Sequence, residues 1–296
     1  MRHPEHDILD LMRRVWAEGD ARTDRTGIGT RAIFGAMLRF DLSDGTVPLM
    51  TTKRVFWKVA LKELIWFLSG ETSIRPLIAQ GVHIWTDWPM ARHAKATGEQ
   101  LTRDAFEARV MSDDAFAAEW GDLGPVYGYQ WRRWPGPDGP IDQIAQLVRD
   151  LRETPTSRRL LFTGWNVADL PRMALPPCHM TYQYFVENGR LHGLLFQRSC
   201  DLGLGFPFNI FEAALLVRVF ADIAGLQPGS IAWMGGDVHL YENHAALAET
   251  QLAREPRPWP KLRLLARHER PEDYRFEDFA IDGYDPLPAI SAPVAV

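Results

Sequence analysis

The spacing of apolar side chains predicts four main helices. In residues 7–16 the apolar positions recur every three or four residues, at Ile8, Leu11, Met12 and Val15, a spacing that places them on one helix face. Residues 141–151 follow the same amphipathic pattern. Residues 57–68 and 210–224 are apolar on nearly all sides, so we expect both of these helices to lie deep in the core.

Charged residues interrupt the two deep helices. Glu63 lies inside residues 57–68, where a carboxylate is costly unless it is paired or used in chemistry. A pair with Lys53 or Arg54 is the structural alternative. The charges within residues 210–224 predict a solvent-facing or functional edge of that helix: Glu212, Arg218 and Asp222.

Shorter apolar runs predict strands. Residues 32–42 alternate between apolar and polar side chains, and three further runs are short and apolar: 160–165, 181–186 and 191–197. Asn188-Gly189, between the last two runs, is typical of a hairpin turn. Because strands and helices do not alternate regularly, we expect an α+β fold, with a mixed or antiparallel sheet packed against long buried helices.

Residues 91–119 differ from the rest of the chain. They are polar, charged and rich in alanine, and they lack the glycine-aromatic pattern found on either side. We interpret them as a helical surface insertion within one domain that spans residues 1–296.

The composition narrows the class of protein. A hydrophobic content of 46% is ordinary for a globular chain, and a net charge of −5 argues against a nucleic-acid coat. The N-terminus is polar, and no run approaches the roughly 18 apolar residues that a membrane span needs. Two cysteines, Cys178 and Cys200, do not form a disulfide framework, so we expect a cytoplasmic protein.

Candidate chemistry centres on Cys178, which lies between a Pro-Pro step and His179. About twenty residues later come Arg198, Ser199 and Asp201. A thiolate is a strong nucleophile, and neighbouring cations favour its formation. One alternative is a buried cysteine that only packs. Another is a cysteine hydrolase with His179 as the base, but adjacent side chains on a strand point to opposite faces.

From the Arg25 loop to the C-terminus, the chain resembles the thymidylate synthase family. The resemblance rests on blocks that occur in one order: DRTGIGT, TTKRVFWK, ELIWFLSGET, GDLGPVYGYQWR, SRR, WNVADLPRMALPPCH, QRSCDLGLGFPFNI, GDVHLYENH, QLAREPRPWPKL and APVAV. It implies a transferase that moves and reduces a one-carbon unit from 5,10-methylenetetrahydrofolate to C5 of dUMP, giving dTMP and dihydrofolate. The implied intermediate is a covalent adduct between Cys178 and uracil C6, because attack at C6 activates C5.

The resemblance also implies catalytic roles. Cys178 matches the family nucleophile, and Arg198 is expected to favour its thiolate. Glu63 matches the carboxylate that organises proton transfer around the uracil carbonyl and the folate. Tyr127 matches the residue associated with proton removal at C5, and Asp201 matches the carboxylate that binds the pterin ring.

Phosphate binding is implied for a group of arginines, whose planar charged forks suit phosphate. Arg25, Arg198 and Ser199 match positions on the same subunit. Arg158 and Arg159 match a pair that reaches across from the partner subunit, which implies a homodimer. Without the resemblance, an adjacent Arg-Arg pair would be interpreted as a solvated loop.

Recognition of the base is implied for Asn209, whose amide complements uracil O4 and N3–H. Cytosine-using relatives have an aspartate there. His239 and Tyr241 match the pair that holds the 3′-hydroxyl, and their spacing places both on one face of a strand. Gln197 and His179 are further expected substrate-binding residues.

The folate is expected to stack on an aromatic and apolar wall: Ile84, Trp85, Trp88 and Leu175. Further contacts are implied beside Asp201, at Leu204, Gly205 and Phe208. The apolar tail, including Ala295, matches a segment that closes over the bound complex and excludes water. We expect no metal, because the histidines lack ligand spacing with cysteines or carboxylates.

Four residues near the expected pocket depart from the family pattern: Gly203, Phe211, Glu212 and Ala213. They leave open a dUMP 5-hydroxymethylase, in which water captures the methylene intermediate and tetrahydrofolate is released. The retained Trp85 and apolar tail favour methylation, since both exclude water.

A catalytically idle homologue that binds nucleotide or RNA is the other alternative. The full set of Cys178, Arg198, Asn209 and Glu63 argues against it, since a binding module has no need of a nucleophile.

Overall fold

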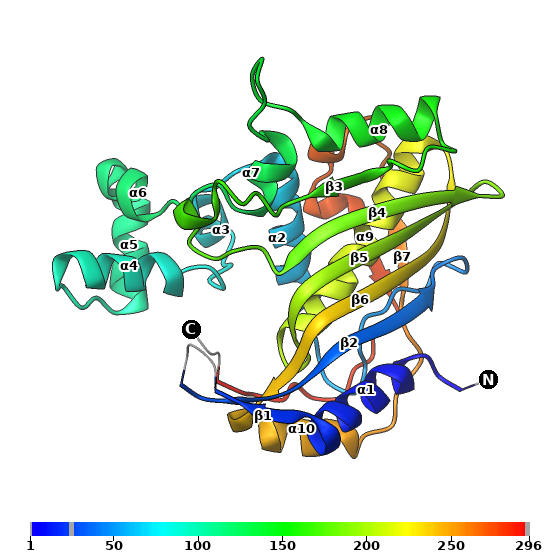
Figure 1. Ribbon diagram of the computed structural model, residues 1–296, viewed down its shortest axis with the longest axis horizontal. Coiled ribbons are helices and arrows are strands. Elements are labelled where there is room, and N and C mark those ends of the chain that lie inside the picture. The colour runs from blue at the N-terminus through cyan, green and yellow to red at the C-terminus, as the bar shows by residue number, and fades with distance from the viewer. Residues whose placement is uncertain (1, 24–26, 294–296) are drawn as a thin grey trace.

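The computed structural model describes residues 2–23 and 27–293 of the 296. A six-stranded sheet crosses the molecule (Figure 1). Its strands, in spatial order, are β1 (Asp20–Arg22), β2 (Thr30–Asp41), β6 (Gln227–Tyr241), β5 (Arg190–Asp201), β4 (His179–Glu187) and β3 (Leu161–Thr163). Neighbours are antiparallel except β5 and β6, which are parallel. The expected α+β fold is confirmed.

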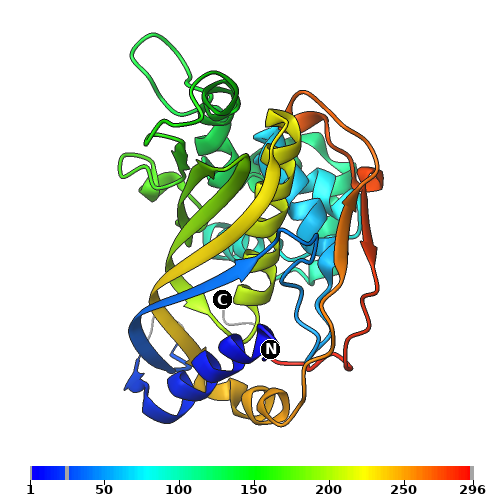
Figure 2. The same cartoon turned by 90° about the vertical axis from the view of Figure 1, so that its right-hand side faces the viewer.

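The two deep helices cover one face of the sheet (Figure 2). α9 (Gly205–Ala224) is the crossover that the parallel pair β5–β6 requires, and α2 (Trp57–Ser69) packs against it. Both predicted helices are confirmed, although α9 begins five residues earlier than its apolar run. α2 ends at Gly70, whose φ of 72° suits a residue without a Cβ.

The remaining helices complete the layer and its edges. The predicted helices α1 (Glu5–Glu18) and α8 (Gln143–Glu153) are confirmed. The others are α3 (Arg75–Ala79), α4 (Asp87–Thr97), α5 (Arg103–Ser112), α6 (Asp114–Trp120), α7 (Tyr127–Arg132) and α10 (Ala245–Leu252). A separate two-stranded sheet joins β7 (Lys261–Leu264) to β8 (Phe279–Asp282). Among the described residues, no helix is long and apolar enough to cross a membrane.

Residues 91–119 lie in the helical lobe of α4–α6, which projects from one end of the molecule (Figure 1). The lobe has a small aromatic core around the buried His93, whose ring lies 5.9, 5.3 and 5.0 Å from those of Phe106, Phe116 and Trp120. The helical content is as expected, and the status of the lobe as an insertion stays a prediction.

The charges along α9 have different surroundings. The solvent-facing interpretation is wrong for Glu212, which is 1% exposed. Asp222, near the C-terminal end, is partly buried and accepts hydrogen bonds from Tyr274 Oη at 2.8 Å and Arg267 Nε at 3.1 Å. The difference arises because Glu212 lies where α9 packs against α2, whereas Asp222 lies in the last turn of α9.

A buried carboxylate in α1 ties the N-terminus to the core. Glu5 accepts hydrogen bonds from the backbone N–H groups of Thr51 and Thr52, from both of their hydroxyls, and from Trp259 Nε1. The donors lie 2.6–3.1 Å from the carboxylate oxygens. A charge that accepts this many hydrogen bonds is stably buried.

Replacing Glu5 with alanine would strip these buried donors of their acceptor. Hydrogen bonds to charged groups are worth about 1.5–3 kcal/mol each, so we expect the free energy of unfolding to fall by about 3 kcal/mol or more. Denaturant unfolding measures this change, with Glu18→Ala at the exposed end of the same helix as the control. Equal stability of the two variants would contradict the assigned role of Glu5.

Candidate active site

The candidate site forms where six segments meet at one end of the sheet. Cys178 precedes β4, and Arg198 to Asp201 end β5. The first turn of α9, Tyr127 at the start of α7, Glu63 in α2 and the loop around Trp85 supply the rest.

Cys178 is clamped from two sides. Its backbone N–H donates to the Tyr127 hydroxyl at 3.0 Å, and its carbonyl accepts from the backbone N–H of Arg198 at 3.0 Å. The Arg198 guanidinium donates to the carbonyls of Pro177 and Pro176 at 2.9 and 2.7 Å, and its Nη2 lies 3.8 Å from Sγ of Cys178. A fixed cation therefore lies next to a half-buried thiol, an arrangement that favours a thiolate.

Tyr127 holds its place at a conformational cost. Its φ of +24° is rare for a residue with a side chain, and such strain tends to occur at functional sites. Burial raises the pKa of Tyr127 well above its usual range, and the nearby Cys178 acts in the same direction. The phenol is therefore protonated at neutral pH.

A chain of amides fixes Asn209. Its Oδ1 accepts from Gln197 Nε2 at 2.8 Å, and Gln197 Oε1 accepts from Trp233 Nε1 at 2.8 Å. His179 lies beside this chain, with Nδ1 3.3 Å from Tyr182 Oη. Burial lowers the pKa of His179 to about 4, although a hydrogen bond with Asn209 acts in the opposite direction. His179 is therefore neutral at pH 7 and is a poor partner for activating a thiol.

His239 and Tyr241 lie on one face of β6, as their spacing predicts, with ring centroids 5.3 Å apart. His239 Nδ1 is 2.8 Å from Asp237 Oδ1, and Arg22 Nη1 donates to Asp237 Oδ2 at 3.0 Å. The hydrogen bond with His239 lowers the pKa of Asp237 below its usual range. The ring of His239 is thereby fixed in orientation.

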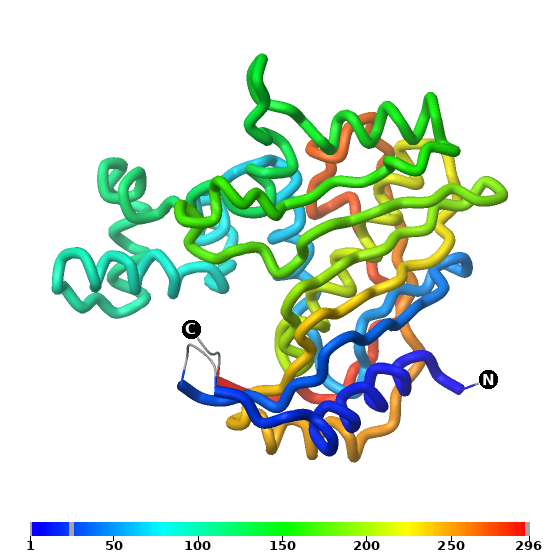
Figure 3. The backbone as a smooth tube through the Cα atoms, viewed as in Figure 1, coloured from blue at the N-terminus to red at the C-terminus, as the bar shows by residue number. Residues whose placement is uncertain are grey.

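Asp201 is a partly buried carboxylate that remains charged. Burial opposes its ionisation, but the His244 imidazole 3.7 Å away and the backbone N–H of Gly203 at 2.7 Å lower its pKa below the usual range. His244 Nε2 also lies 2.9 Å from the Pro293 carbonyl. The last described residues of the chain thus run past the same end of the molecule (Figure 3).

The glycine at position 203 has a steric reason. A Cβ there would lie 2.8 Å from Nδ1 of His244, and the carbonyl of Gly203 accepts a hydrogen bond from the buried Lys53. Burial lowers the pKa of Lys53 to about 8. Lys53 contacts Gly203 instead, and within the described residues Glu63 forms no ion pair with Lys53 or Arg54, so that alternative is wrong.

Glu63 faces two groups inside the core. Trp85 Nε1 donates to its Oε1 at 2.6 Å, and its carboxyl hydrogen-bonds with that of Glu212 in α9. Burial raises the pKa of Glu63, while these two hydrogen bonds act in the opposite direction. Sequence reasoning did not identify Glu212 as the partner, because no local pattern links α2 to α9.

The wall expected to stack on the folate is aromatic. It includes an indole N–H without a hydrogen-bond partner among the described residues. The rings of Trp85 and Trp88 lie 5.2 Å apart, and Trp88 Nε1 is buried without a partner among the described residues. Ile84 is partly exposed beside them. Three other predicted contacts are half-buried: Leu175, Leu204 and Phe208. Gly205 is the first residue of α9.

The helical lobe supports this wall through Glu107 of α5. Its Oε1 accepts from the Thr86 hydroxyl at 2.5 Å, and its Oε2 lies 2.8 Å from His83 Nδ1. These two contacts flank Trp85 in the chain. The lobe therefore fixes the loop on which the wall is built.

Some predicted residues are not brought together within one chain. Arg158 and Arg159 are exposed just before β3. Because Leu161 pairs with Gln183, they lie about 20 Å from Cys178 along the strand direction. Ser199 lies in β5, next to Arg198. Arg25 and Ala295 are outside the described residues.

Two contacts were not anticipated. Arg198 lies over the ring of Trp165, with the guanidinium carbon 5.1 Å from the ring centroid. His244 contacts Asp201, as described above. Both partners occur in blocks that carry the family resemblance, but neither spacing suggests the contact. Among the described residues, no group of three or more His, Cys, Asp or Glu is arranged to hold a metal ion.

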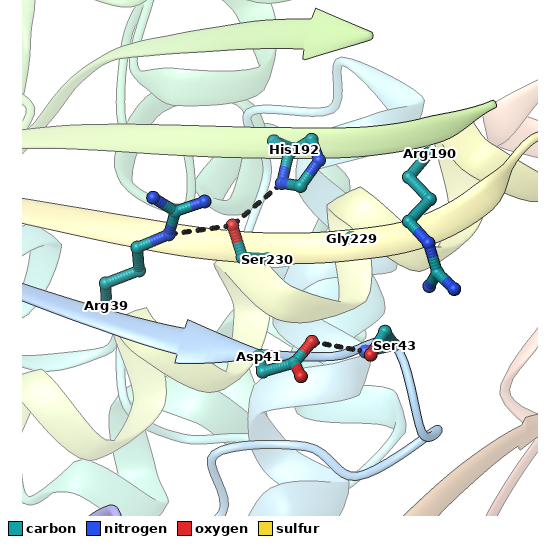
Figure 4. Close-up of a pocket in the computed structure, with 7 residues that line it drawn as sticks. All are labelled: Arg39, Asp41, Ser43, Arg190, His192, Gly229 and Ser230. Carbon is teal, nitrogen blue, oxygen red and sulfur yellow. Dashed lines mark hydrogen bonds between the residues drawn. The ribbon is translucent and has the colours of Figure 1, made fainter. Parts of the chain in front are cut away.

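A separate cavity of about 400 Å³ lies on the sheet face opposite α9 (Figure 4). Its lining comes from β2, β5, β6 and the loop after β2: Arg39, Asp41, Ser43, Arg190, His192, Gly229 and Ser230. Ser230 lies five positions along β6 from the residue opposite Gln197, which is about 16 Å away. The cavity is therefore distinct from the site around Cys178.

Comparison with known proteins gives one consistent result. The family model described as "Thymidylate synthase" matches residues 6–296. A thymidylate synthase of Rhizorhabdus wittichii is 62% identical, with 99% of each chain covered. That of Sphingopyxis alaskensis is 59% identical, covering 99% of this chain and 98% of the relative, and that of Zymomonas mobilis is 56% identical, with 99% of each covered. The chain belongs to the thymidylate synthase family.

Proposed function

We propose that the protein transfers a one-carbon unit from 5,10-methylenetetrahydrofolate to C5 of dUMP and reduces it, giving dTMP and dihydrofolate. The observation that carries this proposal is the half-buried thiol of Cys178, held with the Arg198 guanidinium 3.8 Å from its sulfur. The names of the relatives support the same reaction. We place the protein in the cytoplasm, because a chain with only two cysteines, Cys178 and Cys200, suits a reducing compartment.

Cys178 is the nucleophile in this proposal. Its sulfur lone pair forms a bond to uracil C6, the ring electrons shift toward O4, and C5 becomes a nucleophilic carbon. Arg198 favours the thiolate, and its anchoring to the loop carbonyls fixes the charge before substrate arrives. We assign Tyr127 to removal of the C5 proton through an ordered water, since its own phenol stays protonated.

Asn209 is the proposed base-recognition residue. With Oδ1 held by Gln197, the amide has a set orientation toward the O4 and N3–H groups of uracil. His239 and Tyr241, side by side on β6, are assigned to the 3′-hydroxyl. The neutral His179 lines the base side without adding charge.

The folate, when bound, supplies the one-carbon unit and the hydride. Trp85 and Trp88 would stack on it, and Asp201 is ionised and able to accept N–H groups of the pterin. The buried Nε1–H of Trp88 fits a hydrogen-bond acceptor of such a ligand, because no acceptor meets it within the described residues. These features fit a flat heterocycle with N–H groups along one edge.

We further propose a homodimer that closes through the uncovered sheet face. That face carries four exposed apolar side chains from four strands: Met37, Leu161, Phe185 and Met234. Figure 2 shows that the long helices lie on the other side. An exposed apolar patch of this kind marks an interaction site, and a twofold axis would let one face pair with itself.

In the dimer, phosphate binding would be shared between subunits. Arg198 and Ser199, with Arg25, are assigned to the phosphate from the same chain. Arg158 and Arg159 lie at the rim of the uncovered face, beside β3. We assign them to the partner's site, because they are too far from Cys178 in their own chain.

Incubation with dUMP and 5,10-methylenetetrahydrofolate tests the reaction. We expect dTMP and dihydrofolate in equal amounts, identified by chromatography and mass spectrometry. Formation of 5-hydroxymethyl-dUMP with tetrahydrofolate would contradict methylation, and the absence of any nucleotide product would contradict the proposed function.

Asn209→Asp tests base recognition. A protonated carboxyl presents a donor and acceptor pattern that suits cytosine, so the ratio of kcat/KM for dCMP to that for dUMP should rise by about tenfold or more. Asn188→Asp makes the same chemical change in the exposed hairpin turn and should leave the ratio unchanged. An unchanged ratio in Asn209→Asp would remove this residue from base recognition.

The shared site is tested by combining two inactive chains. One carries Cys178→Ser and the other carries both Arg158→Ala and Arg159→Ala, and heterodimers are purified through two different tags. One of the two sites is intact only if the arginines act across the interface, which predicts about half of the wild-type activity. Heterodimers as inactive as either parent would contradict the shared site.

A further inference from the structure

Two carboxyl groups meet inside the core between α2 and α9. Glu63 is 8% exposed and Glu212 is 1% exposed, and the two side chains hydrogen-bond with each other. Glu212 Oε1 is buried without a donor among the described residues. Since a carboxylate has no hydrogen to donate, at least one of the two groups must carry the proton that joins them.

The polar contacts around Glu63 and Glu212 decide which of the two carboxyl groups carries the shared proton. Among the described residues, neither carboxyl has an ion pair with a lysine, arginine or histidine. Trp85 Nε1 donates to Glu63 at 2.6 Å, whereas Oε1 of Glu212 has no hydrogen-bond donor within the described part of the chain. The ionised form is therefore better solvated at Glu63, and the proton belongs on Glu212.

The other titratable groups nearby add no compensating charge. Tyr182 of β4 interacts electrostatically with Glu212, and Tyr127 of α7 with Glu63. Burial raises the pKa of both phenols, so both are uncharged. Arg218 is on the same helix as Glu212 but six residues away, about 9 Å along the axis.

Burial also raises the pKa of Glu212 well above its usual range, and the neighbouring Glu63 charge acts in the same direction. Two adjacent buried carboxyls cannot both ionise readily. In a site of low dielectric, a neutral carboxylic acid is a strong hydrogen-bond donor to its charged neighbour.

We infer that Glu212 is a positioning residue that stays protonated and donates its hydroxyl to Glu63, so that Glu63 can give up and regain a proton during the reaction. This inference rests on the proposed function, in which Glu63 serves the uracil carbonyl.

As the Cys178 sulfur bonds to C6, the C5–C6 electron pair forms a C4–C5 double bond and the C4–O4 pair moves onto O4. Glu63, starting from the state in which both carboxyls are protonated, donates its proton to O4, directly or through water. The negative charge left on Glu63 is held by the Glu212 hydroxyl and by Trp85 N–H, and the proton returns when the adduct breaks down.

Two variants of similar size separate the possible roles. Glu212→Met removes the donor, so ionised Glu63 loses a hydrogen bond and its pKa rises further. A hydrogen bond to a charged group is worth enough to shift that pKa by about one to two units, so the basic limb of the kcat profile, along which Glu63 loses the proton that it must donate, should move to higher pH by that amount. Glu212→Gln keeps an N–H donor, and its profile should stay within about half a unit of the wild type.

The direction of the shift makes the test decisive. If Glu212 were ionised, both variants would remove a repulsive charge and the limb would move to lower pH, which would overturn the inference. A loss of kcat that is equal at every pH would indicate packing alone and would also overturn it. Glu249→Gln, at an exposed position in α10, is the control, and thermal unfolding checks that each variant is folded.

An infrared titration tests Glu212 without catalysis. The wild type should keep one protonated-carboxyl band above neutral pH, and Glu212→Gln should lose it. If the wild type lacks this band, the inference fails even if dTMP forms. If the band is present but no dTMP forms, the proposed function fails while the carboxyl pair stands.

Discussion

Arg198 ties the loop that carries Cys178 to the end of β5, and the rest of the site is arranged around this connection. Its guanidinium binds two consecutive loop carbonyls and still lies 3.8 Å from the sulfur. Its backbone N–H binds the carbonyl of Cys178 itself. A single residue thus supplies position and charge together, and the strained Tyr127 holds the opposite side. A thiol on an untethered loop would have neither its position nor the nearby cation.

Around this clamp several buried titratable groups are uncharged. His179 is neutral, the Tyr127 phenol is protonated, and the Glu63 and Glu212 carboxyls share their surroundings with aromatic rings. The few charges that remain act more strongly because the local dielectric is low. We therefore view the site as one cation beside the sulfur, one proton-exchanging carboxyl across the ring, and the ionised Asp201 next to His244.

Helical periodicity was sufficient to predict the helices that cover the sheet, and the motif blocks predicted most residues that meet at its end. The central strand β6 was not predicted as a whole, because Pro228, Gly229, Gly235 and Gly236 disfavour a strand in isolation. The pairing of Glu63 with Glu212 was also missed. Two buried acids on different helices become neighbours only through tertiary packing, which no local pattern encodes.

The central claim is that Cys178 forms the covalent bond to the pyrimidine. Incubation with fluoro-dUMP and 5,10-methylenetetrahydrofolate, followed by peptide mass spectrometry, tests it most directly, because fluorine at C5 blocks the later loss of a proton. We predict a stable adduct on the peptide that contains Cys178. An unmodified Cys178, or an adduct on the fully buried Cys200, would contradict the account.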